Sequence, residues 1–230
     1  MFCVKCGTPL PDGANFCFKC GCDLRNLGER AGTGHSAVRV GDYVKFGSYP
    51  QNNGSNKESI EWLVLEVIGN EAFLVSRYGL DCKQYHHEYT LRTWENCDLR
   101  EWLNHEFLKA AFSEEEQQRI KLSWVVNGNN RDYRTIGGSN TRDRVFCLSL
   151  VEAERYFKND SERRCQPTSH ARNQGAWIDD GNGYCYWWLR SPGSCQDWAS
   201  GVGTLGVIDP RGDGVHISDL VVRPALRITL

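Results

Sequence analysis

Four cysteines near the start of the chain have the type and spacing of a metal site. Two Cys-x-x-Cys pairs, each followed by glycine, are separated by ten residues, and they comprise Cys3, Cys6, Cys17 and Cys20. Each pair aims two thiolates at one point, and the glycine allows the backbone to turn its amide groups toward the sulfur atoms. Four thiolates complete a tetrahedral shell, which suits a structural Zn2+ and leaves no coordination position for a substrate.

These pairs resemble the short zinc ribbon that begins many bacterial multidomain proteins, over about the first 24 residues. We therefore expect a zinc ribbon at 1–25 and a flexible linker at 26–37, where glycines occur among few apolar residues. A redox dithiol is the alternative, but two pairs without a strand–helix context disfavour it. Because the ribbon carries few basic residues and no basic-aromatic stripe, a protein-docking or purely structural role is expected in preference to nucleic-acid binding.

The remaining cysteines do not form a disulfide framework. The chain has 11 cysteines, an odd number, and those outside the four-cysteine array are scattered without a pairing rhythm. A chain of 230 residues is long enough to bury a core without disulfides. We expect reduced thiols, several of which fill the core.

The histidines do not form an evident catalytic group. His86 and His87 stand beside Glu88, but neighbouring side chains on a strand point to opposite faces. His170 is expected in the first turn of a helix, and His216 is expected to contact a ligand. Since no nucleophile or acid–base constellation is visible, the sequence predicts a binding protein and not an enzyme.

Two acidic segments weakly resemble cation sites. The segment 209–214 has the look of a calcium loop, but Arg211 occupies a ligand position and no acidic residue closes the loop. The turn at 179–183 is expected to be solvated. The tripeptide at 211–213, Arg-Gly-Asp, matches an adhesion motif that is common by chance.

Composition excludes several classes of partner. Hydrophobic residues make up 40% and charged residues 24% of the chain, as in ordinary globular proteins. A net charge of -2 gives no field that would gather nucleic acid. No apolar run reaches the roughly 20 residues of a membrane span, and the first residues lack the pattern of a secretory signal. We expect a cytoplasmic protein without a membrane partner.

The last part of the chain has a rigid frame around an irregular segment. The frame consists of YWWLRSPG at 186–193 and VRPAL at 222–226. Between them, 194–220 has no helical period and contains no Lys, Glu or Met. An irregular segment held at both ends commonly forms a binding surface. Arg190 and Arg223, within the frame, are expected to stack on aromatic rings or to pair with buried carboxylates.

The pattern along the chain predicts the elements that position these residues. Residues 38–46 alternate as a strand, and 47–51 should break it. A hairpin is expected from 60–68 and 72–76 across Gly69 and Asn70.

Helices should follow the hairpin, beginning at capping boxes on Asp98, Ser113 and Ser149. A strand at 145–148 precedes the third box, and a final strand is expected at 221–230. The first helix should bury one apolar face, made of Leu99, Trp102, Leu103 and Phe107. The order of elements is α+β and not alternating βαβ.

Several motifs together resemble an uncharacterised bacterial domain family. They are FGSYPQ at 46–51, IEWLVL at 60–65, the helix around 93–104, and the two frame motifs. The resemblance runs from about Val40 to the C-terminus. It implies a C-type-lectin-like domain at 38–230, similar in architecture to formylglycine-generating enzymes and to the variable proteins of diversity-generating retroelements. In that fold the first and last strands pair, and the region before the last strand displays the ligand-binding face.

The retroelement resemblance implies that the variable codons encode a restricted set of residues. Mutation at adenine in AAY codons cannot produce Lys, Glu, Gln, Met or Trp, and within 194–220 only Gln196 and Trp198 fall outside the permitted set. Positions with a framework character alternate with the candidate variable positions. The framework positions are Ala199, Val202, Gly206, Gly214 and Val215.

We favour a diversified ligand-binding protein. The alternatives are a lectin-like interaction module of fixed specificity and an oxidase of the formylglycine-generating type. The oxidase would use Cys185 and Cys195 as a copper pair, but their spacing is wider than in that family.

The binding hypothesis assigns ligand contacts to exposed residues of the irregular segment, with Trp198 as an aromatic anchor. Their mixed character suits a protein ligand. The expected contact residues are Asp197, Trp198, Thr204, Leu205, Ile208, Asp209, Arg211, Asp213, His216, Ile217 and Asp219.

Overall fold

Residues 38–54 and 56–230 are described by the structure, a computed structural model. The ribbon and linker predicted at 1–25 and 26–37, with the four zinc-site cysteines, lie outside the described residues. The following account therefore concerns the unit Arg39–Leu230.

The first sheet has the order β1-β2-β3-β12-β7 and is antiparallel throughout. Its strands are β1 (Tyr43–Pro50), β2 (Lys57–Ile68), β3 (Glu71–Ser76), β12 (Ala225–Thr229) and β7 (Val145–Phe146). Along β2 the side chains of Ile60, Trp62 and Val64 are buried while Glu61 and Leu63 between them are partly exposed, as expected for a strand with one face on a core.

The hairpin between β2 and β3 is confirmed. Ile68 pairs with Glu71 across a two-residue loop, and Gly69 has a φ of 60°. Glycine adopts this left-handed backbone without a steric cost, so the local sequence determines the turn.

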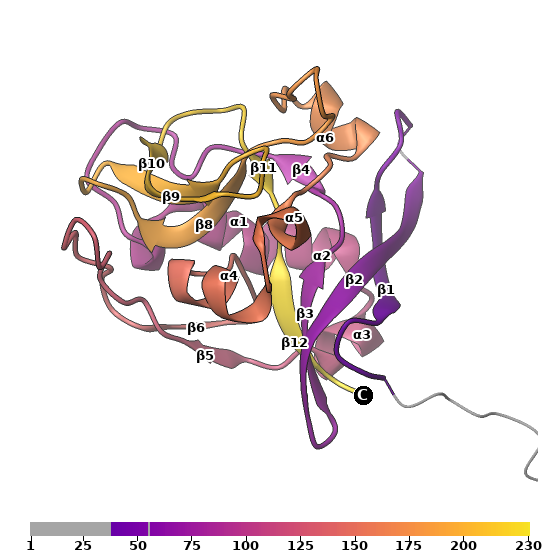
Figure 1. Cartoon of the computed structure of the whole chain (residues 1–230). Coiled ribbons are helices and arrows are strands. Elements are labelled where there is room, and N and C mark those ends of the chain that lie inside the picture. The colour runs from indigo at the N-terminus through magenta and orange to yellow at the C-terminus, as the bar shows by residue number, and fades with distance from the viewer. Residues whose placement is uncertain (1–37, 55) are drawn as a thin grey trace, which may run out of the picture. The chain divides into compact units, whose positions relative to one another are not determined.

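The second sheet has the order β10-β9-β8-β11-β4, in which β10 is an edge strand. Figure 1 shows β8, β9 and β10 stacked together on one side of the domain, away from β1 and β2. The strands are β4 (Asp81–Cys82), β8 (Trp187–Pro192), β9 (Trp198–Val202), β10 (Ile208–Gly214) and β11 (Val221–Val222). A separate pair joins β5 (Ser123–Val125) to β6 (Thr141–Asp143).

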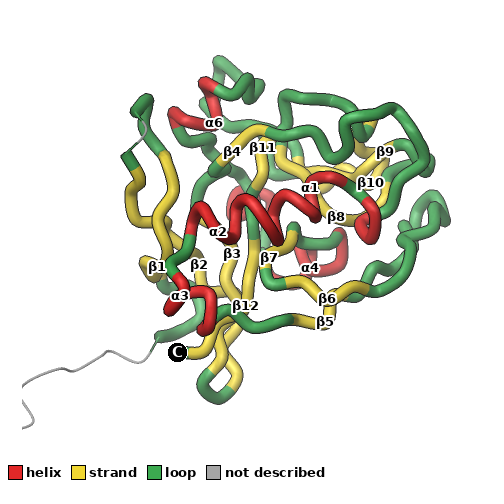
Figure 2. The backbone as a smooth tube through the Cα atoms, turned by 180° about the vertical axis from the view of Figure 1, so that it is seen from behind, coloured by secondary structure: helices red, strands yellow, loops and turns green. Residues whose placement is uncertain are grey.

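The helices are short. They are the 3-10 turn η1 (Trp94–Asn96), α1 (Asp98–Trp102), the π-helical segment η2 (Leu103–Phe107), α2 (Leu108–Ala111), α3 (Glu114–Arg119), α4 (Leu150–Tyr156), α5 (Asp160–Arg163) and α6 (Ser169–Asn173). The run from α1 to α2 is continuous and crosses the back of the domain from the side of β8 and β10 toward β1 (Figure 2). None of the helices in the described residues has the length and apolar character that a membrane crossing requires.

The capping predictions have mixed outcomes. Ser113 and Ser149 cap α3 and α4 through reciprocal bonds with Glu116 and Glu152, as predicted. The box on Asp98 is wrong, because the N-cap of α1 is Cys97 and the Asp98 carboxylate instead accepts from His87.

The helical face predicted from the sequence is largely confirmed. Leu99, Leu103 and Phe107 are buried, while Trp102 is only half-buried. The expected break at 47–51 is wrong, since β1 continues to Pro50 with an irregularity between Lys45 and Ser48.

The expected pairing of the first and last strands is also wrong for the strands that the structure describes. β12 pairs with β3 and β7, whereas β1 pairs with β2. The single predicted strand at 221–230 is divided, because Arg223 and Pro224 separate β11 in the second sheet from β12 in the first. The end of the chain thus connects the two sheets, and Pro224, which has no backbone N–H, stands where strand pairing changes.

Candidate ligand-binding face

The tryptophan-rich frame is the buried floor of the second sheet. Every residue of β8 is buried, and Trp187 and Trp188 have no measurable exposure. Their indole N–H groups donate to backbone carbonyls, Trp187 to Arg163 and Trp188 to Lys83. Tryptophan in a core needs such partners, so the floor is fixed both by packing and by hydrogen bonds.

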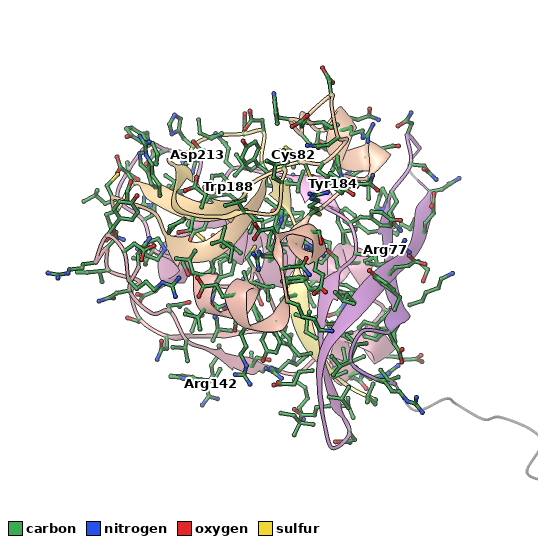
Figure 3. All side chains as sticks on the ribbon, viewed as in Figure 1. Arg77, Cys82, Arg142, Tyr184, Trp188 and Asp213 are labelled. Carbon is green, nitrogen blue, oxygen red and sulfur yellow. The ribbon has the colours of Figure 1, made fainter. Side chains whose placement is uncertain are left out.

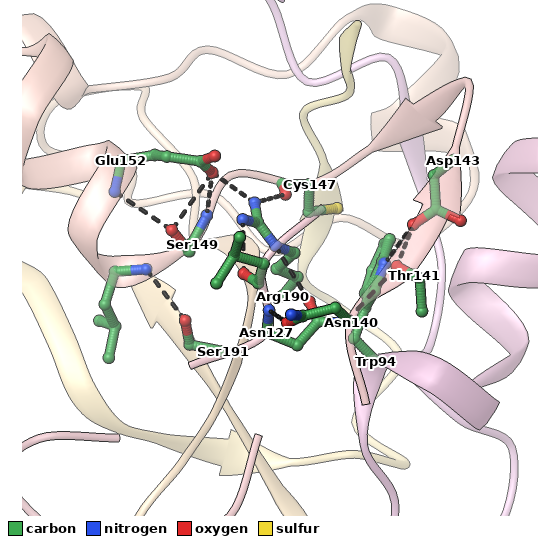
Figure 4. A network of polar contacts seen from close by, with 12 residues as sticks. Trp94, Asn127, Asn140, Thr141, Asp143, Cys147, Ser149, Glu152, Arg190 and Ser191 are labelled. Carbon is green, nitrogen blue, oxygen red and sulfur yellow. Dashed lines mark hydrogen bonds and ion pairs between the residues drawn. The ribbon is translucent and has the colours of Figure 1, made fainter. Parts of the chain in front are cut away.

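Arg190 is the polar centre of this floor (Figure 4). Its guanidinium is 3% exposed, forms a close ion pair with Glu152, and donates to the backbone oxygens of Cys147 and Val126. Burial raises the pKa of the Glu152 carboxyl, but attraction to Arg190 and hydrogen bonds outweigh this and hold the pKa below its usual value. The structural role predicted for Arg190 is confirmed.

Arg223 has the same role at the junction of the two sheets. Its guanidinium carbon lies 5.0 Å from the ring centroid of Trp187 and 5.2 Å from that of Phe157. It donates to the carbonyls of Ser76 and Arg163, at 2.9 and 3.2 Å. Stacking on two rings and donation to carbonyls satisfy the cation without a ligand.

The positions with a framework character in 194–220 are buried, as predicted. Ala199, Val202 and Val215 are at most 1% exposed, and Gly206 and Gly214 are also buried. A Cβ atom on Gly206 would meet the carbonyl oxygen of Asp160 at 1.7 Å, so the close approach of backbone there requires glycine.

The residues around Trp198 form a cluster at the edge of the second sheet. Trp198 is half-buried in β9, its Nε1 donates to the hydroxyl of Tyr89 at 3.3 Å, and the guanidinium carbon of Arg211 lies 5.5 Å from its ring centroid. The ring of His216 lies 4.6 Å from that of Tyr89. We call Tyr89, Asp197, Trp198, Arg211 and His216 the Trp198 face.

Asp197 links the cluster electrostatically. Hydrogen bonds from the side chains of Cys195 and Tyr89, with the nearby His216, hold the pKa of the Asp197 carboxyl below its usual value. Tyr89 accepts a hydrogen bond from Trp198, which orients its phenol although the side chain is 56% exposed. The face presents a pre-oriented aromatic pair beside one cation and one anion.

A second group of candidates is acidic and lies next to Arg211. Burial, and then the charges of Asp209 and Asp219, raise the pKa of Asp213, whereas Arg211 lowers it. Asp213 belongs to β10 and is labelled in Figure 3. The segment 209–214 belongs to β10 with a register irregularity between Asp209 and Asp213, and is therefore an edge strand and not a calcium loop.

Four of the predicted contact residues belong neither to the Trp198 face nor to the acidic group. Thr204 is buried, and its hydroxyl donates to Asp179, so the prediction of an exposed contact is wrong at this position. Leu205 is 57% exposed but belongs to a turn whose carbonyl groups accept from Arg163 and Arg164.

Ile208 and Ile217 are half-buried. Ile208 begins β10 at the end where it pairs with Val202, and Ile217 follows a turn closed on Gly214. These two isoleucines stay predicted contacts outside the two groups.

Tyr89 was missed from the sequence. It lies 109 residues before Trp198, in a loop whose local sequence pattern does not predict where its side chains lie relative to Trp198. An exposed tyrosine beside two histidines is a weak signal, and only the fold brings it to the face.

The two histidines of that loop lie close together, with ring centroids 4.7 Å apart. His86 and His87 do not point apart as strand neighbours would, because residues 83–92 form a loop. Nδ1 of His86 lies 2.9 Å from one oxygen of Asp98, and Nδ1 of His87 lies 2.5 Å from the other. The pKa of His86 is lowered, chiefly by burial. His170, in contrast, lies in the first turn of α6 as predicted.

The described cysteines are free, and five of them are buried, as predicted: Cys82, Cys97, Cys147, Cys165 and Cys185. Burial raises the pKa of Cys82 and of Cys97 to about 12. The Cys185 thiol donates to the carbonyl of Cys165 in the core, whereas Cys195 is exposed. The copper pair considered for an oxidase is therefore divided between the core and the surface.

The sheets and helices define the described part as a mixed α+β domain. Residues 69–230, which are 162 of the 230 residues, match the family described as Domain of unknown function (DUF6273), and the chain belongs to this family. Residues 2–24 match the zinc-ribbon domain, as the cysteine spacing predicted, and such a domain binds zinc. No curated protein and no solved structure matches the chain.

Proposed function

We propose that the domain is a ligand-binding module and that it binds a protein through the Trp198 face. One observation carries the proposal: a half-buried tryptophan, an exposed tyrosine and an exposed arginine are held together by a hydrogen bond and a cation–π contact. Tryptophan, tyrosine and arginine are the residues most enriched at energetic centres of protein interfaces.

The pre-oriented geometry supports binding over a purely structural role. A side chain that is already fixed loses less conformational entropy when a partner arrives. The buried floor of β8 holds the strand that carries Trp198, because Trp187 and Trp188 pair with Val202 and Gly201 of β9. Among the described strands, none pairs with the outer side of edge strand β10, which carries Arg211.

We propose further that the face is diversified on a C-type-lectin-like scaffold, as in retroelement variable proteins. The framework positions are buried, whereas all the candidates except Thr204 are exposed or half-buried, and this supports the proposal. The pairing of β12 with β3 instead of β1 departs from the arrangement that the resemblance implies. A module of fixed specificity is the alternative on the same face.

The ribbon is proposed to hold one structural Zn2+ through Cys3, Cys6, Cys17 and Cys20 and to contact a protein partner. Four thiolates with this spacing support it. The free buried thiols in the described part support a reducing compartment, such as the cytoplasm.

The genomic test of diversification is to sequence the DNA that flanks the gene. A near-copy of the 3′ end that differs mainly at adenines, together with a reverse-transcriptase frame, would establish a diversified receptor. A flanking region without either would leave a module of fixed specificity.

The test of the face is a binding comparison among three full-length variants. Proteins retained by the wild type are identified, and each is tested against Trp198→Ala, Arg211→Ala and the matched control Leu205→Ala. A true ligand should lose at least about tenfold in affinity with either of the first two variants, about 1.4 kcal/mol or more. If a ligand loses affinity only with Leu205→Ala, the binding site lies near the start of β10 and not at the Trp198 face.

A further inference from the structure

We propose that His86, His87 and Asp98 bind one divalent transition-metal ion, and that this ion fixes the loop that carries Tyr89. The site is formed by described residues and uses none of the four cysteines of the ribbon. The metal site itself does not rest on the proposed function.

The donor atoms already converge on a small volume. One ligand atom from each of His86, His87 and Asp98 lies within 4.8 Å of the other two. Zinc sites hold nitrogen and oxygen donors about 2.0–2.2 Å from the ion. The ring of His87 is 64% exposed, so it can turn slightly to complete a set around one ion.

His86 supplies the second observation. Its side chain is 4% exposed, and among the residues that the structure describes its Nδ1 finds no hydrogen-bond partner, although Asp98 lies at 2.9 Å. A buried imidazole nitrogen without a hydrogen bond is costly. An ion between Nδ1 and the carboxylate would satisfy both groups.

The site opens onto a cleft with room for further ligands. The cleft has a volume of about 450 Å³, and His87 and Asp98 lie on its wall. Glu101 and Glu106 also line it, against one lysine, Lys83. The excess of carboxylates attracts a cation, and two imidazoles with one carboxylate favour a transition metal over Mg2+ or Ca2+.

Arg92 sets a condition on binding. Its Nε donates to Nε2 of His86 at 2.6 Å, so in this arrangement the proton of the neutral ring is on Nδ1. Metal at Nδ1 moves that proton to Nε2, which can then no longer accept from Arg92. The guanidinium must turn away, and Glu88, whose carboxylate is 4.0 Å from Nη2 of Arg92, provides its alternative partner.

The loop of this site is attached directly to the Trp198 face. His86 N donates to the carbonyl of Val215, and the backbone N–H of Arg92 donates to that of Gln196. Tyr89 lies between these two anchors and touches Trp198. A metal that joins the loop to α1 through Asp98 therefore restricts the position of Tyr89.

The test uses the full-length protein, loaded first with one equivalent of Zn2+ to fill the ribbon and then titrated with Co2+. We expect one further equivalent to bind, with d–d absorption and without the thiolate charge-transfer band of a cysteine site. His87→Ala should weaken this binding at least about tenfold. His105→Ala, which removes another histidine of the same cleft, is the matched control and should leave it unchanged.

The proposal is wrong if no further equivalent binds, if the bound Co2+ shows thiolate charge transfer, or if His105→Ala weakens binding as much as His87→Ala. Because His87 is exposed, its replacement should not unfold the domain, and a circular dichroism melt verifies this. Arg92→Gln should tighten Co2+ binding several-fold, since it removes a positive charge and the competing donor. Weaker binding in Arg92→Gln would contradict the arrangement proposed for His86.

Hydrogen exchange tests the effect on the loop. The second metal equivalent should slow exchange in the peptide that contains 86–92 in the wild type and not in His87→Ala. Unchanged exchange in a protein that binds the metal would contradict the fixing of Tyr89. Loss of ligand binding in Trp198→Ala concerns the proposed function alone, because that variant keeps all three metal donors.

Discussion

Loss of the ion pair between Arg190 and Glu152 should strongly lower the stability of the domain, because Arg190 is buried. Arg190→Met removes the partner of a carboxylate that lies against the buried floor. We expect a loss of about 3–5 kcal/mol in the free energy of unfolding at pH 7, because the remaining charge is uncompensated. Urea unfolding measures this loss.

The matched control for Arg190 is Arg131→Met. Arg131 pairs with Glu154 at the surface, and its side chain is 62% exposed, so its replacement should change the free energy of unfolding little. Equal losses in the two variants would contradict the structural role of Arg190. The pKa of Glu152 is lowered by folding, so the stability that its charge contributes is present above about pH 4.3 and is lost as the pH falls through the folded value.

Asp213 has the opposite pH dependence. Burial and neighbouring carboxylates raise its pKa, so its ionisation weakens the folded state. This cost is absent below the unfolded value of about 3.9 and is complete once the pH exceeds the folded value. Asp213→Asn should therefore raise the melting temperature at pH 7 and should have little effect near pH 3.5.

The expected gain from Asp213→Asn is only about 1–3 °C, because the side chain is partly solvated. Differential scanning calorimetry at the two pH values measures it. Asp180→Asn replaces an exposed aspartate of another loop and should leave the melting temperature unchanged at both. A gain for Asp213→Asn that persists at pH 3.5 would have a cause other than ionisation.

At the scale of the element, β10 depends on one glycine. Gly212 has a φ of 72°, and a Cβ atom there would meet the carbonyl oxygen of Ala199 at 2.0 Å. Gly212→Ala should therefore combine a left-handed backbone cost with a steric clash, about 2–5 kcal/mol in total. Since Arg211 and Asp213 flank this residue, ligand binding should weaken as well.

Gly69→Ala separates the two costs of Gly212→Ala. Gly69 has a φ of 60° but has open space around its position, so alanine there should cost about 1–2 kcal/mol. Chemical denaturation of both variants gives the difference that is due to the clash. If the two variants are equally destabilised, the close packing of β9 against β10 is not as described.

Elements with strong local signals agree with the sequence. The capping serines Ser113 and Ser149 and the turn at Gly69 are determined by hydrogen bonds and dihedral angles within a few residues. Asp98 had the same local pattern, yet the tertiary contact with His87 took its carboxylate. A local pattern therefore predicts a cap only where no distant donor competes.

At the scale of the whole molecule, the last strands bind the two sheets together. β11 and β12 are separated by Arg223 and Pro224 and lie in different sheets. We expect the sheets to unfold together. Pulsed alkylation under native conditions, followed by peptide mapping, should modify Cys195 at once, and Cys82 in the second sheet at the same slow rate as Cys147 beside the first.

Unequal rates would contradict this cooperative unfolding. Faster modification of Cys82 than of Cys147 would mean that the second sheet opens alone. Cys97 and Cys165 serve as internal controls, because both are buried and should follow the common rate.

The sequence by itself determined the zinc ribbon, the buried frame of β8 and the buried framework positions within 194–220. These features depend on spacing, on residue type and on the alternation of side chains along a strand. Only the tertiary structure decided that Tyr89 joins Trp198, that His86, His87 and Asp98 converge, and that the final strand divides between two sheets. Such contacts depend on strand pairing and loop paths between residues far apart in the chain, for which no local hydrogen bond or periodicity carries a signal.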